Sequence, residues 1–180
     1  MIFFTFRGFE VEEHSTFTKD GYMLILHRIP ARLEAKGRLN YKKPVLFMHG
    51  CMLSSECWVA LQDKDRGLPY LLSSMGYDVW LGNNRGNRYC NIHSKYKPSD
   101  PAFWDFSIDE MALYDVPAMV DYILEETRFK SLTYIGFSQG TAQCFASLSI
   151  NKELNSKINH FIALAGTTKP HGNRLFNFSL

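Results

Sequence analysis

No hydrophobic run in this 180-residue chain approaches the length of a membrane-spanning helix, and neither sign of charge dominates. The apolar stretch over residues 1–6 ends at Arg7, whereas about 20 apolar residues are needed to cross a bilayer. The stretch also lacks the basic start and cleavage site of a signal peptide, so we expect its side chains to pack in the core. The net charge is +2 without a stripe of Lys and Arg, and nucleic acid is therefore not an expected partner.

Cysteine is scarce, and its spacing fits no metal site. The four cysteines show neither metal-type pairing nor a disulfide framework, which favours a reducing compartment; they are Cys51, Cys57, Cys90 and Cys144. Cys144 lies on the apolar face of a predicted helix and is expected to be a small core residue. The chain contains 46% hydrophobic and 21% charged residues, as expected for one folded globular domain.

The most informative segment is Gly136-Phe137-Ser138-Gln139-Gly140. An apolar, β-prone run precedes it over residues 131–135, and an Ala-rich run without Gly or Pro follows it over residues 141–148. A Gly-x-Ser-x-Gly between strand and helix is the nucleophile elbow of an α/β-hydrolase, a tight turn that exposes the Ser hydroxyl at the carboxyl edge of the sheet. The alternative is a glycine-rich turn with a solvated Ser138.

The remaining chain alternates strand and helix signals, which predicts an α/β fold with a mostly parallel sheet. We expect an N-terminal β-hairpin and loop over residues 1–43, with strands at 10–18 and 22–29, and an α/β-hydrolase core over residues 44–180. The chain after Ser138 is too short to complete such a sheet. The further predicted strands are 44–48, 77–81, 131–136 and 160–165, and the predicted helices are 68–75, 108–124 and 139–150.

The predicted helix after Ser107 carries two local signals. Ser107 and Glu110 have the spacing of a capping box, in which each side chain bonds the other's backbone N–H. Pro117 falls inside the apolar pattern of this helix, and proline cannot donate the backbone hydrogen bond that an unbroken helix requires. We therefore expect a kink or a restart at Pro117.

A serine nucleophile needs a base that an acid orients, and no clear partner for Ser138 is visible. In α/β-hydrolases the chain order is Ser, acid, His. No Asp follows Ser138, and the only later Glu is Glu153, expected at the end of the helix after the elbow. His160 begins a predicted strand and His171 lies in a turn, so each has a structural or solvated role as its simplest interpretation. The earlier histidines would violate the order: His14, His27, His49 and His93.

An acyl-transfer site also needs an oxyanion hole made of two preorganised N–H donors. One is expected from the backbone of Gln139, at the start of the helix after the elbow. The other is expected from the loop His49-Gly50-Cys51 after strand 44–48, with the N–H of Cys51 as donor and Gly50 permitting the turn. Alternatively, Cys51 is only a small buried residue. His49 is expected to shape the loop rather than to act as a base.

Several motifs resemble the acid lipases and fungal steryl ester hydrolases of the α/β-hydrolase fold, over about residues 9–165. Phe137 before the Ser and Thr141-Ala142-Gln143 after it are more similar to the fungal enzymes than to the animal lysosomal and gastric ones. The other matching segments are Asp20-Gly21-Tyr22, Arg28-Ile29-Pro30, His49-Gly50, Ser54-Ser55, Gly76-Tyr77-Asp78-Val79-Trp80-Leu81-Gly82-Asn83, Arg85-Gly86-Asn87, Phe103-Trp104, Phe106-Ser107, Asp109-Glu110-Met111-Ala112, Tyr114-Asp115 and Pro117-Ala118.

The resemblance implies that Ser138 is the nucleophile and that the N–H groups of Cys51 and Gln139 form the oxyanion hole. It implies fatty-acid esters of sterols or glycerol as substrates, no metal or cofactor, and an intracellular location on lipid droplets or membranes. It also implies a later Asp, a later His and a lipid-gating cap, which this sequence lacks, so the chain resembles the N-terminal half of such an enzyme. Two hypotheses remain: a lipid ester hydrolase or a fragment of one, and an inactive remnant that at most binds lipid or a partner.

Overall fold

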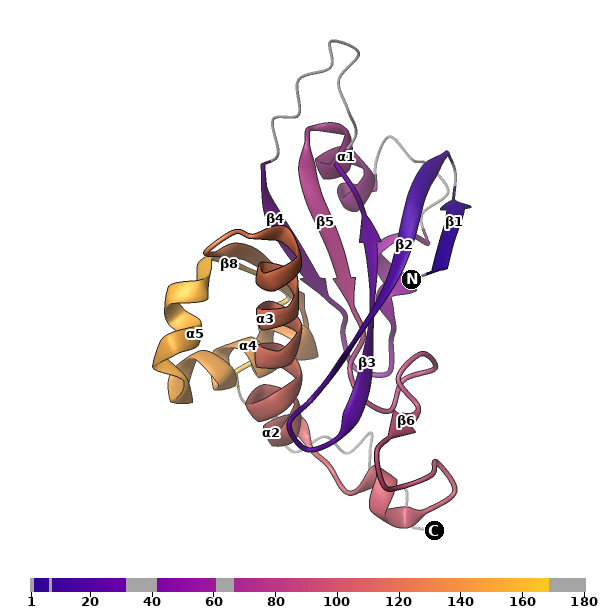
Figure 1. Ribbon diagram of the computed structural model, residues 1–180. Coiled ribbons are helices and arrows are strands. Elements are labelled where there is room, and N and C mark those ends of the chain that lie inside the picture. The colour runs from indigo at the N-terminus through magenta and orange to yellow at the C-terminus, as the bar shows by residue number, and fades with distance from the viewer. Residues whose placement is uncertain (1, 7, 32–41, 61–66, 169–180) are drawn as a thin grey trace.

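The computed structural model describes residues 2–6, 8–31, 42–60 and 67–168, which form one mixed sheet with helices on both faces (Figure 1). The strands are β1 (Ile2–Phe6), β2 (Phe9–Phe17), β3 (Tyr22–Ile29), β4 (Lys42–Met48), β5 (Tyr77–Gly82), β6 (Ile92–His93), β7 (Leu132–Phe137) and β8 (Ile158–Leu164). The helices are α1 (Leu68–Ser74), α2 (Ile108–Glu110), α3 (Val116–Thr127), α4 (Gln139–Ile150) and α5 (Lys152–Lys157), with the short turns η1 (Ser55–Trp58), η2 (Pro101–Trp104) and η3 (Met111–Asp115).

The order of the strands confirms the predicted α/β fold. The sheet runs β1-β2-β3-β5-β4-β7-β8, and β6 pairs with β3. Strands β5, β4, β7 and β8 are parallel neighbours, whereas β1, β2 and β3 are antiparallel. The expected hairpin is β2 and β3, and it extends the central sheet because β3 pairs antiparallel with β5.

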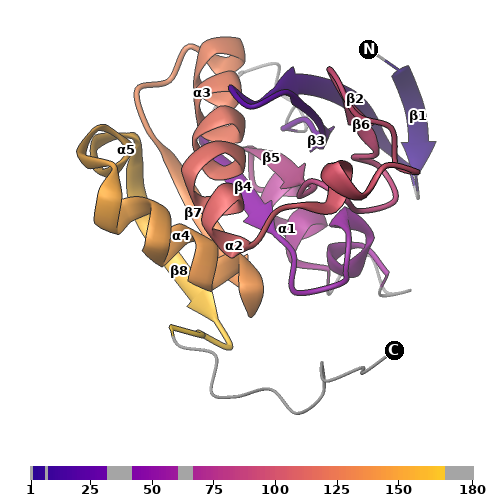
Figure 2. The ribbon, with the colours of Figure 1, turned by 90° about the horizontal axis from the view of Figure 1, so that it is seen from below.

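The core lies on both faces of the sheet, since neighbouring residues of a strand point to opposite sides. In β4, Leu46 and Met48 pack on the face covered by α3 and α4, whereas Val45 and Phe47 pack on the face of α1 and η1. Figure 2 shows α3 and α4 together on one side of the strands and α1 on the other. This double cover explains why residues 44–48 form an uninterrupted apolar run.

The helical segment after Ser107 confirms both local predictions. The Ser107 hydroxyl accepts from the N–H of Asp109, and the Glu110 carboxylate accepts from the N–H of Ser107 at 2.6 Å. The segment then passes through a π-helical turn, η3, before α3 begins with Pro117 in its first turn. The π-helical turn thus lies directly before Pro117, which cannot donate the backbone hydrogen bond that an unbroken α-helix requires.

Three sequence-based boundaries are corrected. Strand β4 begins at Lys42, so the polar loop ends earlier than residue 43. Glu153 lies on the separate helix α5 rather than at the end of α4, because the Asn151 side chain caps a new helix at the N–H of Leu154. Strand β8 begins at Ile158 rather than at residue 160. His171 and the side chains of residues 1–7 lie outside the described part.

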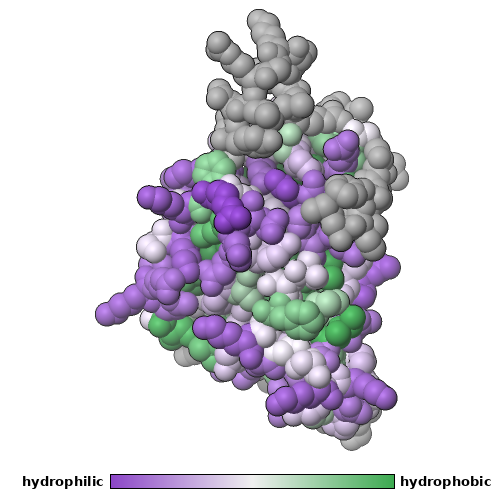
Figure 3. All heavy atoms as spheres, in the orientation of Figure 1, coloured by the Kyte–Doolittle hydropathy of each residue, from purple (hydrophilic) through white to green (hydrophobic). Residues whose placement is uncertain are grey.

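Strand β8 is an edge strand with an exposed apolar surface. It pairs only with β7 among the described strands, and Ile162 and Leu164 are 46% and 38% exposed. Figure 3 shows the face of the molecule that is seen in Figure 1, on which hydrophobic side chains form separate patches among hydrophilic ones. Within the described ranges, no helix is both long enough and apolar enough to cross a membrane.

Candidate active site

Ser138 occupies a strained turn between β7 and α4. Its backbone has φ 50° and ψ −113°, a region that residues with a side chain rarely adopt and that costs about 1–3 kcal/mol. The turn is held by hydrogen bonds from the Ser138 N–H to the Leu164 carbonyl (3.0 Å) and from the Thr141 hydroxyl to the Ser138 carbonyl (2.6 Å). The sequence therefore forms the strand–turn–helix that the Gly-x-Ser-x-Gly pattern predicts.

The two glycines of the pattern are required by backbone packing. A Cβ at Gly136 would lie 2.7 Å from the Gly140 carbonyl oxygen, within the turn itself. A Cβ at Gly140 would lie 2.5 Å from the carbonyl oxygen of Met48, at the end of β4. Any larger residue at either position would therefore push α4 away from the sheet.

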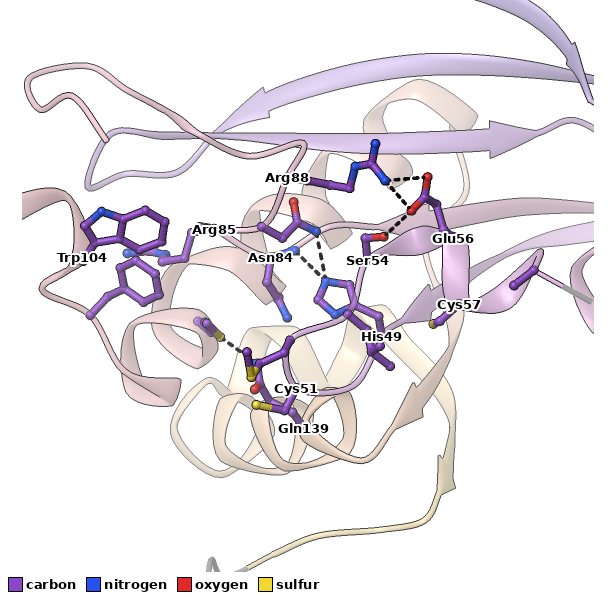
Figure 4. Close-up of a pocket in the computed structure, with 17 residues that line it drawn as sticks. His49, Cys51, Ser54, Glu56, Cys57, Asn84, Arg85, Arg88, Trp104 and Gln139 are labelled. Atoms are coloured by element: carbon purple, nitrogen blue, oxygen red, sulfur yellow. Dashed lines mark hydrogen bonds and ion pairs between the residues drawn. The ribbon is translucent and has the colours of Figure 1, made fainter. Parts of the chain in front are cut away.

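A cavity of about 760 Å³ lies at the carboxyl edge of the sheet beside this turn. Cys51 and Gln139 line it together, and Figure 4 shows them next to each other at one end. Its wall also includes three exposed apolar side chains, Met52, Leu53 and Trp104, which we call the apolar rim. The structure thus brings together the two candidate oxyanion donors from segments far apart in the sequence.

Cys51 and Gln139 both present backbone N–H groups that their own segments leave free. Gln139 is the first residue of α4, and the first N–H groups of a helix have no intrahelical acceptor. The loop hydrogen bond between the Leu53 N–H and the Gly50 carbonyl spans Cys51 without using its N–H. Cys51 is exposed at the cavity rather than buried, which rules out the alternative of a small core residue.

His49 has both ring nitrogens engaged within the loops around the cavity. Its Nε2 accepts from the N–H of Asn84 at 3.1 Å, so Nδ1 carries the proton and donates to the Gly50 carbonyl at 2.8 Å. Burial lowers the pKa of this imidazole and keeps it neutral. His49 therefore shapes the loop that carries Cys51, as expected, and is not placed to take a proton from Ser138.

The other described histidines lie away from the turn. His160 pairs with Thr133 at the start of β7, and at about 3.3 Å per residue this end of the strand is roughly 16 Å from Ser138. His14 bonds Glu12 and Tyr122, and His27 bonds Ser55. His93 stacks on Tyr96. Among the described residues, no histidine is therefore available as a base for Ser138.

Glu56 is the one carboxylate in the described wall of the cavity, and it accepts hydrogen bonds from neighbouring side chains. Tyr89 donates to it at 2.7 Å and Arg88 at 3.1 Å. The hydrogen bond from Tyr89 lowers the pKa of Glu56, with Arg88 acting in the same direction. Glu153 is exposed on α5, where it pairs with Lys157. Neither carboxylate orients a histidine toward the turn.

Sequence analysis missed a buried polar network beneath the cavity. Arg85 is buried and pairs with Asp20 at 2.6 Å and with Asp115 at 2.7 Å, under the ring of Tyr22. Next to it, the buried Asn84 accepts from the side chain of Gln143 on α4 at 3.1 Å. The sequence signal that could have revealed this network is the polar run over residues 83–87. This run directly follows a buried strand and must therefore emerge at the same sheet edge as the elbow.

Comparison with known families agrees with this geometry. Residues 43–178 match the family described as the alpha/beta hydrolase fold, and residues 3–62 match the partial alpha/beta-hydrolase lipase region. The chain belongs to the α/β-hydrolase family. The predicted family and fold class are therefore confirmed.

Curated relatives of this chain are named as lipases. A probable lipase of Schizosaccharomyces pombe is 52% identical over 92% of this chain and 37% of its own length. Lipase member K of Homo sapiens is 45% identical (88% of this chain, 39% of its own), and gastric triacylglycerol lipase of Bos taurus is 42% identical (94% and 43%). The chain thus spans well under half the length of these relatives.

Solved structures show the same fold at low sequence identity. An epoxide hydrolase of Vigna radiata superposes with a TM-score of 0.58 at 16% identity, over 91% of this chain and 41% of its own. A predicted CIB-like hydrolase of Thermoplasma acidophilum gives 0.55 at 16% identity, over 87% and 63%. These similarities establish the architecture of the hydrolase chain and nothing about its substrate.

Replacing Gly140 by Ala should destabilise the hydrolase chain because the added methyl would meet the backbone of β4. We expect a loss of about 3 kcal/mol in the free energy of unfolding, measured by urea denaturation. The matched control is Gly166→Ala, whose new Cβ would meet only the side chain of Ala163, at 3.7 Å. Equal stability of the two variants would contradict the close packing of α4 on β4.

Proposed function

We propose that this chain carries the nucleophile and the oxyanion hole of a lipid ester hydrolase. The observation that carries the proposal is the strained backbone of Ser138 beside a cavity lined by Cys51 and Gln139. Relatives named lipases, 42% to 52% identical to the chain, support the reaction class. No metal or cofactor takes part in the proposed reaction.

In the proposed reaction, the Ser138 hydroxyl attacks the carbonyl carbon of an ester and gives its proton to a base. The carbonyl oxygen becomes negative, and the N–H groups of Cys51 and Gln139 donate hydrogen bonds to it. The intermediate then expels the alcohol, which takes up the proton, and leaves an acyl group on Ser138. Water releases the fatty acid by the same steps in reverse order.

The base and its orienting acid are the parts of this mechanism that the described residues do not supply. We propose that both belong to the portion of the relatives' length that this chain does not span. The lack of a described histidine near Ser138 favours the second hypothesis for the chain by itself, an inactive remnant that at most binds lipid or a partner.

The proposed substrates are fatty-acid esters of sterols, with triacylglycerol second. The apolar rim supports a lipid substrate, because Met52 is 87% and Trp104 50% exposed at the cavity, and large exposed apolar groups are typical of binding surfaces. The fungal-type segment from Gly136 to Gln143 supports the sterol preference by family analogy alone. Such substrates imply work at the surface of lipid droplets or membranes inside the cell.

The chain by itself should hydrolyse esters poorly, and a serine-directed fluorophosphonate should label Ser138 only slowly, because no described residue accepts the proton of the hydroxyl. Loss of triad members lowers turnover by roughly 10⁴- to 10⁶-fold and leaves about 10³- to 10⁴-fold over water. Mass spectrometry should place the label on Ser138, and Ser138→Ala should remove it. Robust turnover of a p-nitrophenyl ester that depends on Ser138 would mean that the chain contains its own base.

Cys51 should act through its backbone in a form of the protein that hydrolyses esters. Cys51→Ala keeps the N–H and should keep most of the turnover. Cys51→Pro removes the donor and should lower turnover by roughly 10²- to 10³-fold, the effect of one oxyanion donor. Circular dichroism must show that both variants fold. Loss of turnover in a folded Cys51→Ala variant would instead assign the role to the thiol.

A protein extended to the full length of its relatives should hydrolyse cholesteryl oleate and, more slowly, triolein, both presented as emulsions. The Ser138→Ala variant is the control for each substrate, and released oleate is the measured product. Faster hydrolysis of triolein would reverse the proposed preference while keeping the reaction. Activity confined to short soluble esters would exclude a lipid substrate.

A further inference from the structure

The two proposed oxyanion donors belong to segments that are separate in the chain. Cys51 follows β4, whereas Gln139 begins α4 after β7. Both N–H groups must point at one oxygen, and such sites must be held to within about 0.5 Å of the productive geometry. Packing of Gly140 against Met48 fixes how closely the two segments approach, but a contact between backbones does not by itself fix their sideways placement.

Asn84 connects these two segments from the loop after β5. Its backbone N–H donates to His49 Nε2 at 3.1 Å, and His49 in turn holds the Gly50 carbonyl next to Cys51. Its side-chain oxygen accepts from Gln143 Nε2 at 3.1 Å, one turn into α4. Figure 4 shows the side chain of Asn84 extending from its loop toward the end of the cavity where Cys51 and Gln139 lie.

Gln143 is also linked to the first turn of α4 by hydrogen bonds through Tyr134 of β7. Its Nε2 lies 3.5 Å from the Tyr134 hydroxyl, and that hydroxyl donates to the Gly140 carbonyl at 2.9 Å. Gln143 and Tyr134 are fully buried, and Asn84 is 2% exposed. Water therefore does not compete for these hydrogen bonds.

We infer that Asn84 and Gln143 form a positioning bridge that sets the Cys51 and Gln139 N–H groups relative to each other. Neither side chain contacts the reacting atoms; each acts through the loop or helix that it holds. The inference rests on the proposed function, because it assigns the bridge to the oxyanion hole of that reaction.

The bridge is a poor arrangement for stability alone, which supports a role in geometry. Asn84 Nδ2 and Gln143 Oε1 are both buried without a hydrogen-bond partner in the described part of the chain. A buried polar atom that lacks a partner costs free energy, whereas replacing both members of a buried pair by apolar groups of similar shape can be nearly neutral. Two apolar residues would therefore fill this space without leaving a polar side-chain atom of the pair unpaired.

The test compares Asn84→Leu, Gln143→Met and the double variant, in the 180-residue chain and in a protein extended to the full length of its relatives. Each single variant leaves a former partner unsatisfied and should lower the melting temperature. The double variant should regain most of that loss, because both polar groups are gone. If the bridge had only a structural role, the double variant would regain every other property together with its melting temperature.

The first readout is the rate of Ser138 labelling by a fluorophosphonate in the extended protein, where the proposed base is present, separated into binding and bond formation. In the double variant we expect bond formation to slow by roughly 10- to 100-fold, the scale of a displacement of about 1 Å, with binding unchanged. The matched control is Tyr122→Phe, which removes a hydrogen bond to His14 between α3 and β2. The control should label at the wild-type rate.

The second readout does not depend on reactivity. Hydrogen exchange followed by mass spectrometry should show faster exchange over residues 47–53 and 139–145 in the double variant, and no change there in Tyr122→Phe. If the extended protein with wild-type residues is not labelled at Ser138 but exchange increases as expected, the proposed function is wrong and the bridge stands. A double variant that labels and exchanges like wild type would overturn the bridge, whatever its melting temperature.

Discussion

The close approach of helix α4 to the ends of β4 and β7 is the constraint on which the site depends. Gly140 meets the carbonyl of Met48, and Gly136 meets the carbonyl of Gly140, at distances that leave no room for a side chain. The turn between them must therefore be sharp, and Ser138 is forced to a positive φ. The same contact brings the start of α4 beside the loop after β4, where Cys51 lies.

Buried hydrogen bonds complete what this contact begins. The loops after β4 and β5 contain few apolar side chains that could fix them by packing, and polar side chains hold them instead. His49 connects the loop after β4 to Asn84, which lies in the loop after β5. The Asn84 side chain in turn connects this second loop to Gln143 on α4. Arg85 adds buried ion pairs with Asp20 and Asp115, which connect the same loop to β3's hairpin turn and to η3. Such networks favour one arrangement, because another arrangement would lose these buried hydrogen bonds and ion pairs.

The two halves of the sheet differ in how fully their strands are buried. Strands β3, β4, β5 and β7 have neighbours on both sides in the sheet, and their central residues are buried. Strand β8 exposes apolar residues at the other edge, yet its last carbonyl holds the N–H of Ser138. The proposed nucleophile and oxyanion donors are therefore positioned by described residues, whereas the proposed base is not.

The sequence by itself determined most of the central elements and the turn that carries Ser138, but not β1, β6 or α5. Its signals are local: the apolar run over residues 44–48, the capping box at Ser107, the proline at residue 117 and the small residues at Gly136 and Gly140. Tertiary structure decided which loops share the cavity, because hydrogen bonds between Asn84, His49 and Gln143 join residues that no local pattern relates. It also decided that His160 lies at the wrong end of β8 to serve Ser138, since His160 pairs with Thr133 near the start of β7, at the edge of the sheet opposite the elbow.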